Sequence, residues 1–378
     1  MKIALVSPYD LAVPGGVNNH ILPLAEHFRR AGHDVRVIGP ASEGGTLPAV
    51  SGLIVIGKPF PVPASGSVAR IALSLRLSGQ VKQVLRTECF DIVHVHEPLM
   101  PFLPIQFLRF SDAVNVGTFH AAKEGGNRLY SYSRRLLRRW YRKLDGKIAV
   151  SPAAADLVSR YFRGYYNIIP NGVDLPHFSL PVAPFPQFRD DKRNILFLGR
   201  FEKRKGLSYL LRAYPAVKRE LPDTRLIIAG EGRARPRYER YVRRAGLEDV
   251  VFTGYVPYDD LPRYHRSAAV YCAPATGNES AGIVLLEAMA AGRAIVASNI
   301  EGYASVVTHN VEGLLVPPKD PEALSHALVH ILADDALRER MGERARLRAE
   351  EYSWERVSQR ILSYYERIMY EKRLNRGA

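Results

Sequence analysis

One segment in the second half of the chain has the residue types of an anion-binding site. Residues 277–292 read GNESAGIVLLEAMAAG and follow the short aliphatic run Val270–Ala273. The apolar residues after Gly282 predict a buried helix. Its first backbone amides, at Ala281, Gly282 and Ile283, have no partner within the helix and would bind a diphosphate at the positive end of the helix dipole.

The same segment carries two carboxylates. Glu279 stands just before the predicted helix and Glu287 follows eight residues later, about two turns deeper. One carboxylate could therefore bind a sugar and the other a ribose. An alternative of similar weight is structural: Glu279 would cap the helix, and Glu287 would be a buried acid with a partner.

A run of basic residues follows another aliphatic stretch, Ile195–Gly199. Residues 199–206 read GRFEKRKG and include Arg200 and Lys205. A departing diphosphate gains negative charge, which fixed cations in a dry site stabilise more in the transition state than in the ground state. The alternative is a solvated loop of scattered charges. The position directly after a parallel strand favours the binding role.

The elements that must position these residues alternate regularly. Short β-branched and aliphatic runs recur between longer stretches of helical period such as Val17–Ala31, which is typical of βαβ units and a parallel sheet. The Pro-rich stretch Pro176–Pro186 interrupts the rhythm and predicts a linker. The expected strands are Ile3–Ser7, Val35–Gly39, Ile92–His96, Asn115–His120 and Ile148–Ser151 before the linker, and Ile195–Gly199, Arg225–Gly230, Val250–Gly254, Val270–Ala273 and Ala294–Ser298 after it.

This pattern predicts an α/β protein with two doubly wound, Rossmann-like domains that face each other across a cleft. The first domain would span residues 1–178 and the second residues 186–356. A helical stretch from Trp354 to about Arg373 ends the chain. It is long enough for residues 357–378 to pack back on the first domain.

Composition narrows the function classes. The 378 residues include 53 Lys and Arg against 38 Asp and Glu, a formal net charge of +15, and 47% are hydrophobic. A disordered chain is excluded, and the charge favours an anionic partner. The two cysteines, Cys89 and Cys272, exclude a disulfide scaffold or a cysteine zinc site. The first apolar run is too short for a signal peptide and no run suits a membrane span, so we expect a cytoplasmic location.

Several motifs occur together in an order that resembles the retaining glycosyltransferases of family four. They are Glu279-x7-Glu287, Gly15-Gly16, Asn171–Asp174 and the basic run 199–206. The resemblance covers nearly the whole chain and implies the GT-B fold. Within the family, five further motifs are similar to those of enzymes that transfer mannose to phosphatidylinositol: PGGV at 14–17, GSVAR at 66–70, HVHEP at 94–98, TFH at 118–120 and VYCAP at 270–274.

The resemblance also implies residue roles. Arg200 and Lys205 would neutralise the donor diphosphate, Glu287 would bind the nucleotide ribose, and Glu279 would hydrogen-bond the transferred sugar. His120 would contact that sugar near its reacting carbon, so the catalytic set would be His120, Arg200, Lys205 and Glu279. Gly16 would let the backbone approach the phosphates, with Ala281, Gly282 and Ile283 completing the donor site. The acceptor would meet Tyr9, Asn18, Arg70 and Lys123.

The implied reaction moves a hexose, with mannose from GDP-mannose favoured, to a phosphatidylinositol-type lipid at the cytoplasmic face of the membrane. Retention would need no protein nucleophile, since the leaving phosphate takes the acceptor proton, and no prosthetic group or essential metal. The chain departs from the pattern in three places: Ala281 stands where the family most often has Phe, Asn18 where Gln is usual, and Leu99-Met100 where a small polar pair is more usual. Alternatives are a UDP-sugar transferase acting on diacylglycerol or a soluble sugar, a nucleotide-sugar epimerase, and a basic binding module without catalysis.

His94 and His96 alternate along a predicted strand and would share one face. Two imidazoles on one face can bind a metal, but no further ligand except Glu97 stands at suitable spacing. We expect both rings to pack beneath the cleft.

Residues 128–144 form a basic amphipathic stretch. Leu129, Tyr132, Leu136, Trp140 and Leu144 recur at helical spacing. Such a helix can lie in a membrane interface, or pack its apolar side on the sheet with its arginines solvated. The segment Ser67–Arg86 repeats the basic pattern. Nucleic acid is a rival partner for this charge, but no nucleic-acid-binding motif is present and we expect none. The candidate membrane residues are Arg128, Arg134, Arg135, Arg138, Arg139 and Trp140.

Overall fold

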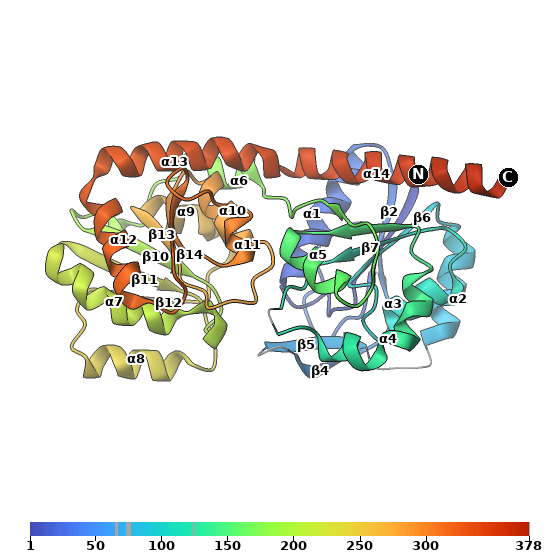
Figure 1. Cartoon of the computed structure of the whole chain (residues 1–378), viewed down its shortest axis with the longest axis horizontal. Helices are drawn as coiled ribbons and strands as arrows, with labels where there is room; N and C mark the ends of the chain where they lie inside the picture. The colour runs from blue at the N-terminus through green and yellow to red at the C-terminus, as the bar shows by residue number, and fades with distance from the viewer. Residues whose placement is uncertain (65–66, 73–76, 124, 378) are drawn as a thin grey trace. The chain divides into compact units, whose positions relative to one another are not determined.

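The computed structural model describes residues 1–64, 67–72, 77–123 and 125–377, and its elements form two compact units (Figure 1). Unit 1 comprises Met1–Asn171 and Trp354–Ala378, and unit 2 comprises Gly172–Ser353. Each unit is an α/β structure built on one parallel sheet.

The sheet of unit 1 has the strand order β3-β2-β1-β6-β7-β8-β9. Every neighbouring pair is parallel. The central strands β1 and β6 are apolar or buried along their length because helices cover both faces. The strands are β1 (Lys2–Val6), β2 (Asp34–Gly39), β3 (Leu53–Val55), β6 (Ile92–His96), β7 (Val114–Phe119), β8 (Gly146–Ala149) and β9 (Asn167–Ile168), and a separate antiparallel pair is formed by β4 (Pro59–Ala64) and β5 (Ser67–Ala72).

Helix α14 (Trp354–Gly377) belongs to the core of unit 1. It lies against α1 (Gly16–Arg30) and β7 (Figure 1). The side chains of Trp354, Ile361 and Tyr365 are buried there, which ties the end of the chain to its first strands. The other helices of unit 1 are α2 (Leu77–Glu88), α3 (Leu103–Phe110), α4 (Arg128–Tyr141) and α5 (Pro152–Ser159).

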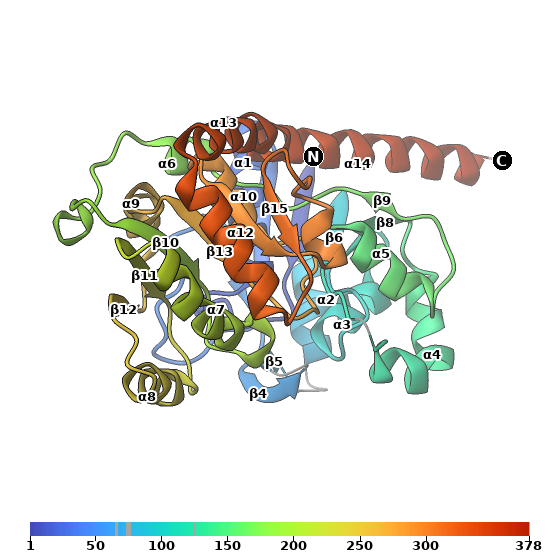
Figure 2. The same cartoon turned by 60° about the vertical axis from the view of Figure 1, so that its left-hand side comes forward.

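The sheet of unit 2 has the order β12-β11-β10-β13-β14-β15, and all its pairs are parallel. Its strands are β10 (Arg193–Leu198), β11 (Thr224–Ala229), β12 (Val250–Gly254), β13 (Val270–Ala273), β14 (Ala294–Ser298) and β15 (Gly313–Val316). Buried clusters cover both faces. Helices α7 (Leu207–Glu220) and α12 (Pro321–Ala333) lie side by side on one of them (Figure 2).

The remaining elements of unit 2 are mostly short. The helices are α6 (Leu175–Ser179), α8 (Arg235–Arg244), α9 (Leu261–Ser267), α10 (Ile283–Ala290), α11 (Glu301–Ala304) and α13 (Asp335–Ala349), and the 3₁₀ turns are η1 (Pro186–Phe188), η2 (Lys203–Lys205), η3 (Tyr258–Asp260) and η4 (Glu350–Tyr352).

The prediction of two doubly wound sheets is confirmed, and every expected strand is present within one or two residues. The expected linker Pro176–Pro186 is partly wrong, because α6 occupies its first residues. Asp174 caps this helix by accepting a hydrogen bond from the backbone N–H of His177 at 3.1 Å.

Strand order reverses between β1 and β6 in unit 1 and between β10 and β13 in unit 2. The connections leaving the carboxyl ends of such strands diverge and leave a crevice for ligands. Residues after these strands are therefore the first candidates for a site in each unit.

Candidate functional site

The loops after β10 and β13 bring a cation and a carboxylate together in unit 2. Lys205 Nζ lies 2.8 Å from Glu279 Oε1, and Arg204 pairs with the same oxygen. Gly206 allows this approach: its φ is +74°, and a Cβ atom there would lie 1.7 Å from the carbonyl oxygen of Pro274. The backbone N–H of Thr276 donates to the carbonyl of Arg204 at 2.8 Å and fixes the two loops together.

Arg200 lies differently from Lys205. Its side chain is 62% exposed and pairs with Glu202 at 3.2 Å, and Glu202 also pairs with Arg204 at 2.9 Å. In this conformation the structure brings Lys205 and Arg204 to Glu279. Sequence reasoning gave Arg204 no role, and its only signal was its place in the basic run.

Helix α10 begins as its sequence predicts. Gly282, with φ +52°, precedes the first helical residue, and its carbonyl accepts the N–H of Leu285 at 2.7 Å. The N–H groups of Ile283 and Val284 precede this ladder and are free of it. Glu279 binds cations and does not cap the helix, since the N-cap position belongs to Gly282. The preceding Asn278 holds φ at +57°, an uncommon conformation that often marks functional loops.

Glu287 lies in the second turn of α10 and is only 9% exposed. Burial raises its pKa to about 8, and the nearby Lys205 offsets only part of this rise. Within the described part of the chain no cation lies within ion-pair distance of Glu287. The structural alternative, in which Glu287 is a buried acid paired with a cation, is therefore not supported.

The side chain of Asn18 holds the loop after β1 in unit 1 by hydrogen bonds. Asn18 is 2% exposed, and its amide nitrogen donates to the carbonyls of Asp10 and Val13 at 2.8 and 3.1 Å. Its amide oxygen accepts from the Ser7 hydroxyl at 2.8 Å. Asn18, expected at the acceptor, is thus engaged in holding the loop that carries Tyr9.

Arg70, also expected at the acceptor, contacts the same loop of unit 1. The backbone of Arg70 accepts the N–H of Asp10 at 2.9 Å, and its exposed guanidinium lies 4.0 Å from the Asp10 carboxylate. Tyr9 is half-buried, and burial raises its pKa. Lys123, expected at the acceptor, is half-buried after β7, and Gly16, expected at the donor phosphates, is exposed in the first turn of α1.

Glu97 organises the turn that carries His120. Its carboxylate is 4% exposed and accepts backbone N–H groups from His120 at 2.7 Å and Ala121 at 2.8 Å. Burial raises its pKa to about 7, and these two hydrogen bonds oppose the rise. Glu97 itself holds φ at +49°. The His120 ring is fixed further by a 2.9 Å hydrogen bond between its Nε2 and Nδ1 of His96.

His94 is packed as expected. One of its ring nitrogens is bonded to the Tyr365 hydroxyl at 2.5 Å and the other to the Thr118 hydroxyl at 2.6 Å. Both nitrogens are used, so His94 has no lone pair available for a ligand. It ties β6 to β7 and to α14.

Helix α4 divides its apolar residues between two sides. Asn127 caps its start by accepting the N–H of Tyr130. Tyr130, Leu137 and Tyr141 are buried, so one side of α4 packs against the rest of unit 1, as the alternative to membrane binding expects. A second apolar row stays outside: Tyr132 is 88% exposed, Leu136 67% and Leu129 37%. Five exposed arginines flank this row, namely Arg128, Arg134, Arg135, Arg138 and Arg139, while Trp140 is half-buried.

A hollow of about 260 Å³ adjoins α4. The C-terminal half of α4 contributes Arg134, Arg138 and Tyr141 to its lining. The segment after α5 contributes Tyr161, Phe162 and Arg163. Three guanidinium groups and aromatic walls make this hollow suitable for an anionic group.

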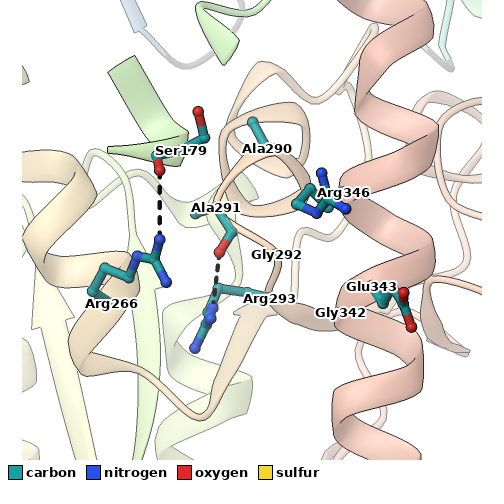
Figure 3. Close-up of a pocket in the computed structure, with 9 residues that line it drawn as sticks. All are labelled: Ser179, Arg266, Ala290, Ala291, Gly292, Arg293, Gly342, Glu343 and Arg346. Carbon is teal, nitrogen blue, oxygen red and sulfur yellow. Dashed lines mark hydrogen bonds between the residues drawn. The ribbon is translucent and has the colours of Figure 1, made fainter. Parts of the chain in front are cut away.

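A further pocket, of about 330 Å³, lies in unit 2 at the C-terminal end of α10 (Figure 3). Three arginines line it. Arg266 donates to the carbonyls of Ser179 and Leu180, and Arg293 to those of Ala268 and Ala291. These bonds satisfy carbonyl groups at the ends of α6, α9 and α10, which gives Arg266 and Arg293 a structural role. Lys205, Glu279 and Glu287 do not line this pocket.

Comparisons with known proteins identify the family. A model described as Glycosyltransferase Family 4 matches residues 14–176, and one described as Glycosyl transferases group 1 matches residues 183–348. A phosphatidyl-myo-inositol mannosyltransferase of Mycolicibacterium smegmatis is 40% identical, over 97% of this chain and 94% of the relative. The chain belongs to glycosyltransferase family 4. A relative of the same name from Propionibacterium freudenreichii is 34% identical over the same shares.

Solved structures agree with this assignment. Sucrose-phosphate synthase of Thermosynechococcus elongatus has a TM-score of 0.79 at 22% identity, covering 98% of this chain and 99% of that one. Anabaena HepE, solved with UDP, has a TM-score of 0.76 at 19% identity, covering 97% and 100%. The fold is GT-B, and the protein is a glycosyltransferase. None of its described helices combines the length and apolar character needed to cross a membrane.

Proposed function

We propose that this glycosyltransferase moves mannose from GDP-mannose to a phosphatidylinositol-type lipid with retention of configuration. The observation that carries the proposal is the 40% identity, over almost the full length, to a phosphatidyl-myo-inositol mannosyltransferase. The loops of unit 2 support the proposal, because they bring Lys205 and Glu279 together in the segment that leads into α10.

On this proposal unit 2 binds the donor. The diphosphate is held by Lys205, Arg204, Arg200 and the first amides of α10, where the backbone of Ala281, Gly282 and Ile283 contributes. Glu287 accepts hydrogen bonds from the ribose hydroxyls. Glu279 orients the transferred sugar. Its pairing with Lys205 at 2.8 Å fixes the cation and the carboxylate relative to each other before the donor arrives.

The chemical step breaks the bond between the sugar C1 and the diphosphate oxygen and forms a bond from C1 to the acceptor hydroxyl oxygen. The hydroxyl proton passes to the departing diphosphate on the same face. The negative charge that grows on the leaving group is stabilised by Lys205 and its neighbours. No prosthetic group, protein nucleophile or essential metal takes part. His120 contacts the sugar from unit 1, where Glu97 and His96 hold its ring.

The acceptor side is proposed for unit 1. Tyr9, Arg70 and Lys123 contact the lipid headgroup, and Gly16 lets the backbone approach the donor phosphates. Asn18 holds the loop that carries Tyr9 through its hydrogen bonds to Ser7, Asp10 and Val13. The exposed row of Leu129, Tyr132 and Leu136 on α4 enters the interface of an anionic membrane while the flanking arginines meet headgroups. The enzyme would act at the cytoplasmic face as a peripheral membrane protein, without nucleic acid as a partner.

Release of nucleoside diphosphate tests the proposal. The assay combines GDP-mannose, UDP-glucose or UDP-N-acetylglucosamine with vesicles that contain either phosphatidylinositol or diacylglycerol in a neutral background. We expect turnover with GDP-mannose and phosphatidylinositol vesicles. A UDP-sugar as the preferred donor, or turnover with a soluble sugar and no vesicles, would refute it. Conversion of the nucleotide sugar without any acceptor would indicate an epimerase.

Donor affinity should depend on pH through Glu287. Its raised pKa, about 8, keeps the carboxyl protonated at neutral pH in the free enzyme. The ionised form accepts two ribose hydrogen bonds, so donor binding releases a proton below pH 8. We expect GDP affinity to rise by up to about tenfold per pH unit between about pH 7 and 8. Calorimetry in buffers of different ionisation enthalpy measures the proton release.

The matched variant for this experiment is Glu287→Gln. It keeps the size of the side chain and removes the titration, so its GDP affinity should be weaker and no longer change in this pH window. An unchanged proton release in Glu287→Gln would assign the effect to another group and remove Glu287 from the donor site.

A further inference from the structure

Three imidazoles meet in unit 1, from three separate elements. His20 comes from α1, His96 from the end of β6, and His120 from the turn after β7. One ligand nitrogen from each lies within 4.8 Å of those of the other two. The ring centroids are 5.4 Å apart for His20 and His96, and 5.0 Å apart for His20 and His120.

These rings hold nitrogen atoms that protein groups do not satisfy. His20 is 2% exposed, and neither of its ring nitrogens has a hydrogen-bond partner of ordinary geometry; the same holds for Nε2 of His96, whose side chain is fully buried. The side chain of Asn171 lies close enough to His20 for a weak hydrogen bond, but its buried amide oxygen likewise has no partner of ordinary geometry. A buried polar group without a hydrogen-bond partner destabilises the folded state, so a cluster of such groups is unusual unless a ligand uses it.

His94 shows the contrast within the same group of rings. It stacks on His96 with centroids 4.4 Å apart, yet both of its nitrogens are bonded. The ring nitrogens without a partner therefore belong to His20 and His96, and none belongs to His94. Trp354, the first residue of α14, packs edge-on against His20 with ring centroids 5.3 Å apart.

The donor set suits a transition metal. A neutral imidazole presents one ring-nitrogen lone pair to a metal ion. Three imidazoles are a common ligand set for Zn²⁺ and favour Co²⁺, Ni²⁺ and Cu²⁺ over Mg²⁺, which prefers oxygen.

We propose that His20, His96 and His120 form a binding site for a divalent first-row transition metal of the zinc class. The site is additional to the glycosyl transfer, which needs no metal there. Binding would hold the His120 ring on the metal. If His120 contacts the transferred sugar, as the proposed function has it, the bound ion inhibits transfer.

The test titrates Co²⁺ into the chelator-treated full chain and follows visible absorption and heat. Two surface features would bind metal independently, namely the exposed pair His326 and His330 one turn apart on α12 and the exposed thiol of Cys89. All proteins therefore carry His326→Gln, His330→Gln and Cys89→Ser. We expect one Co²⁺ per chain, with the stronger absorption of a tetrahedral or five-coordinate site.

His20→Gln is the decisive variant and should weaken Co²⁺ binding by about 100-fold. His96→Gln should do the same and guards against a folding defect in one variant. His27→Gln, on the same helix but outside the cluster, should bind as the parent does. Binding that is absent from the parent, or equal in the parent and a folded His20→Gln protein, would overturn the site. Thermal unfolding followed by circular dichroism establishes that each variant is folded.

A second readout separates this proposal from the proposed function. Zn²⁺ at concentrations that saturate the Co²⁺ site should lower sugar transfer by the parent and spare any activity that His20→Gln retains. This result depends on the role of His120, whereas the Co²⁺ titration does not. A metal site can thus be established or refuted whether or not the enzyme transfers mannose.

Discussion

Lys205→Ala is expected to lower kcat for sugar transfer by about 100- to 1,000-fold, the cost of removing one fixed group that stabilises charge in a transition state. Lys205 is 14% exposed and lies 2.8 Å from Glu279, so its ammonium group is held in place before the donor binds. The larger part of the loss should fall on kcat, because the charge on the leaving diphosphate grows as the bond breaks. Steady-state kinetics with varied donor measures both constants.

Lys203→Ala is the matched control for this substitution. Lys203 stands two residues earlier in the same turn, η2, and is exposed. Its removal changes the net charge equally but should alter kcat less than about twofold, as expected for a solvated charge. Equal losses in the two variants would show that general electrostatic attraction, and no specific contact by Lys205, explains the basic run.

Replacing Arg134, Arg135, Arg138 and Arg139 by Ser should weaken binding to anionic vesicles by about 1,000-fold, because each basic residue near such a surface contributes about 1 kcal/mol. The exposed row of Leu129, Tyr132 and Leu136 would keep only weak binding of its own. Co-sedimentation with vesicles of phosphatidylglycerol and phosphatidylcholine measures the change. Neutral vesicles should bind the parent and the variant about equally.

Helix α8 provides the control for charge. It also carries exposed arginines, and Arg237, Arg240, Arg243 and Arg244 can be replaced by Ser with the same change of net charge. This variant should bind anionic vesicles nearly as well as the parent. Equal weakening by the α8 and α4 variants would contradict a specific role of α4 and leave the overall charge of +15 as the cause.

The sequence was sufficient for the central strands and for the strand, loop and helix around Glu279. Val270–Ala273 and Ile283–Ala290 follow from an aliphatic run, a Gly-rich loop and a second apolar run, which are local signals. Strand β4 could not be predicted in this way, because Pro59, Pro61 and Pro63 indicate irregular chain. Proline is tolerated there because β4 and β5 form a two-stranded pair of their own.

Contacts between residues that are distant in the sequence could not be predicted from the sequence. The spacing of α4 predicted an apolar side but could not tell that Leu137 and Tyr141 face the core while Leu136 and Tyr132 stay exposed, since adjacent rows of one helix have the same period. The pairing of Arg204 with Glu279 depends on how closely two loops approach. The histidine cluster depends on three strand and helix ends that the sheet order brings together.

Product analysis tests the central claim most directly. The purified enzyme is incubated with GDP-mannose and vesicles containing phosphatidylinositol, and the lipids are examined by mass spectrometry and NMR. The account predicts a new lipid that is heavier by one hexose, with the mannose attached to the inositol ring in the same anomeric configuration as in the donor. An unmodified lipid pool, or a mannolipid of inverted configuration, would contradict it.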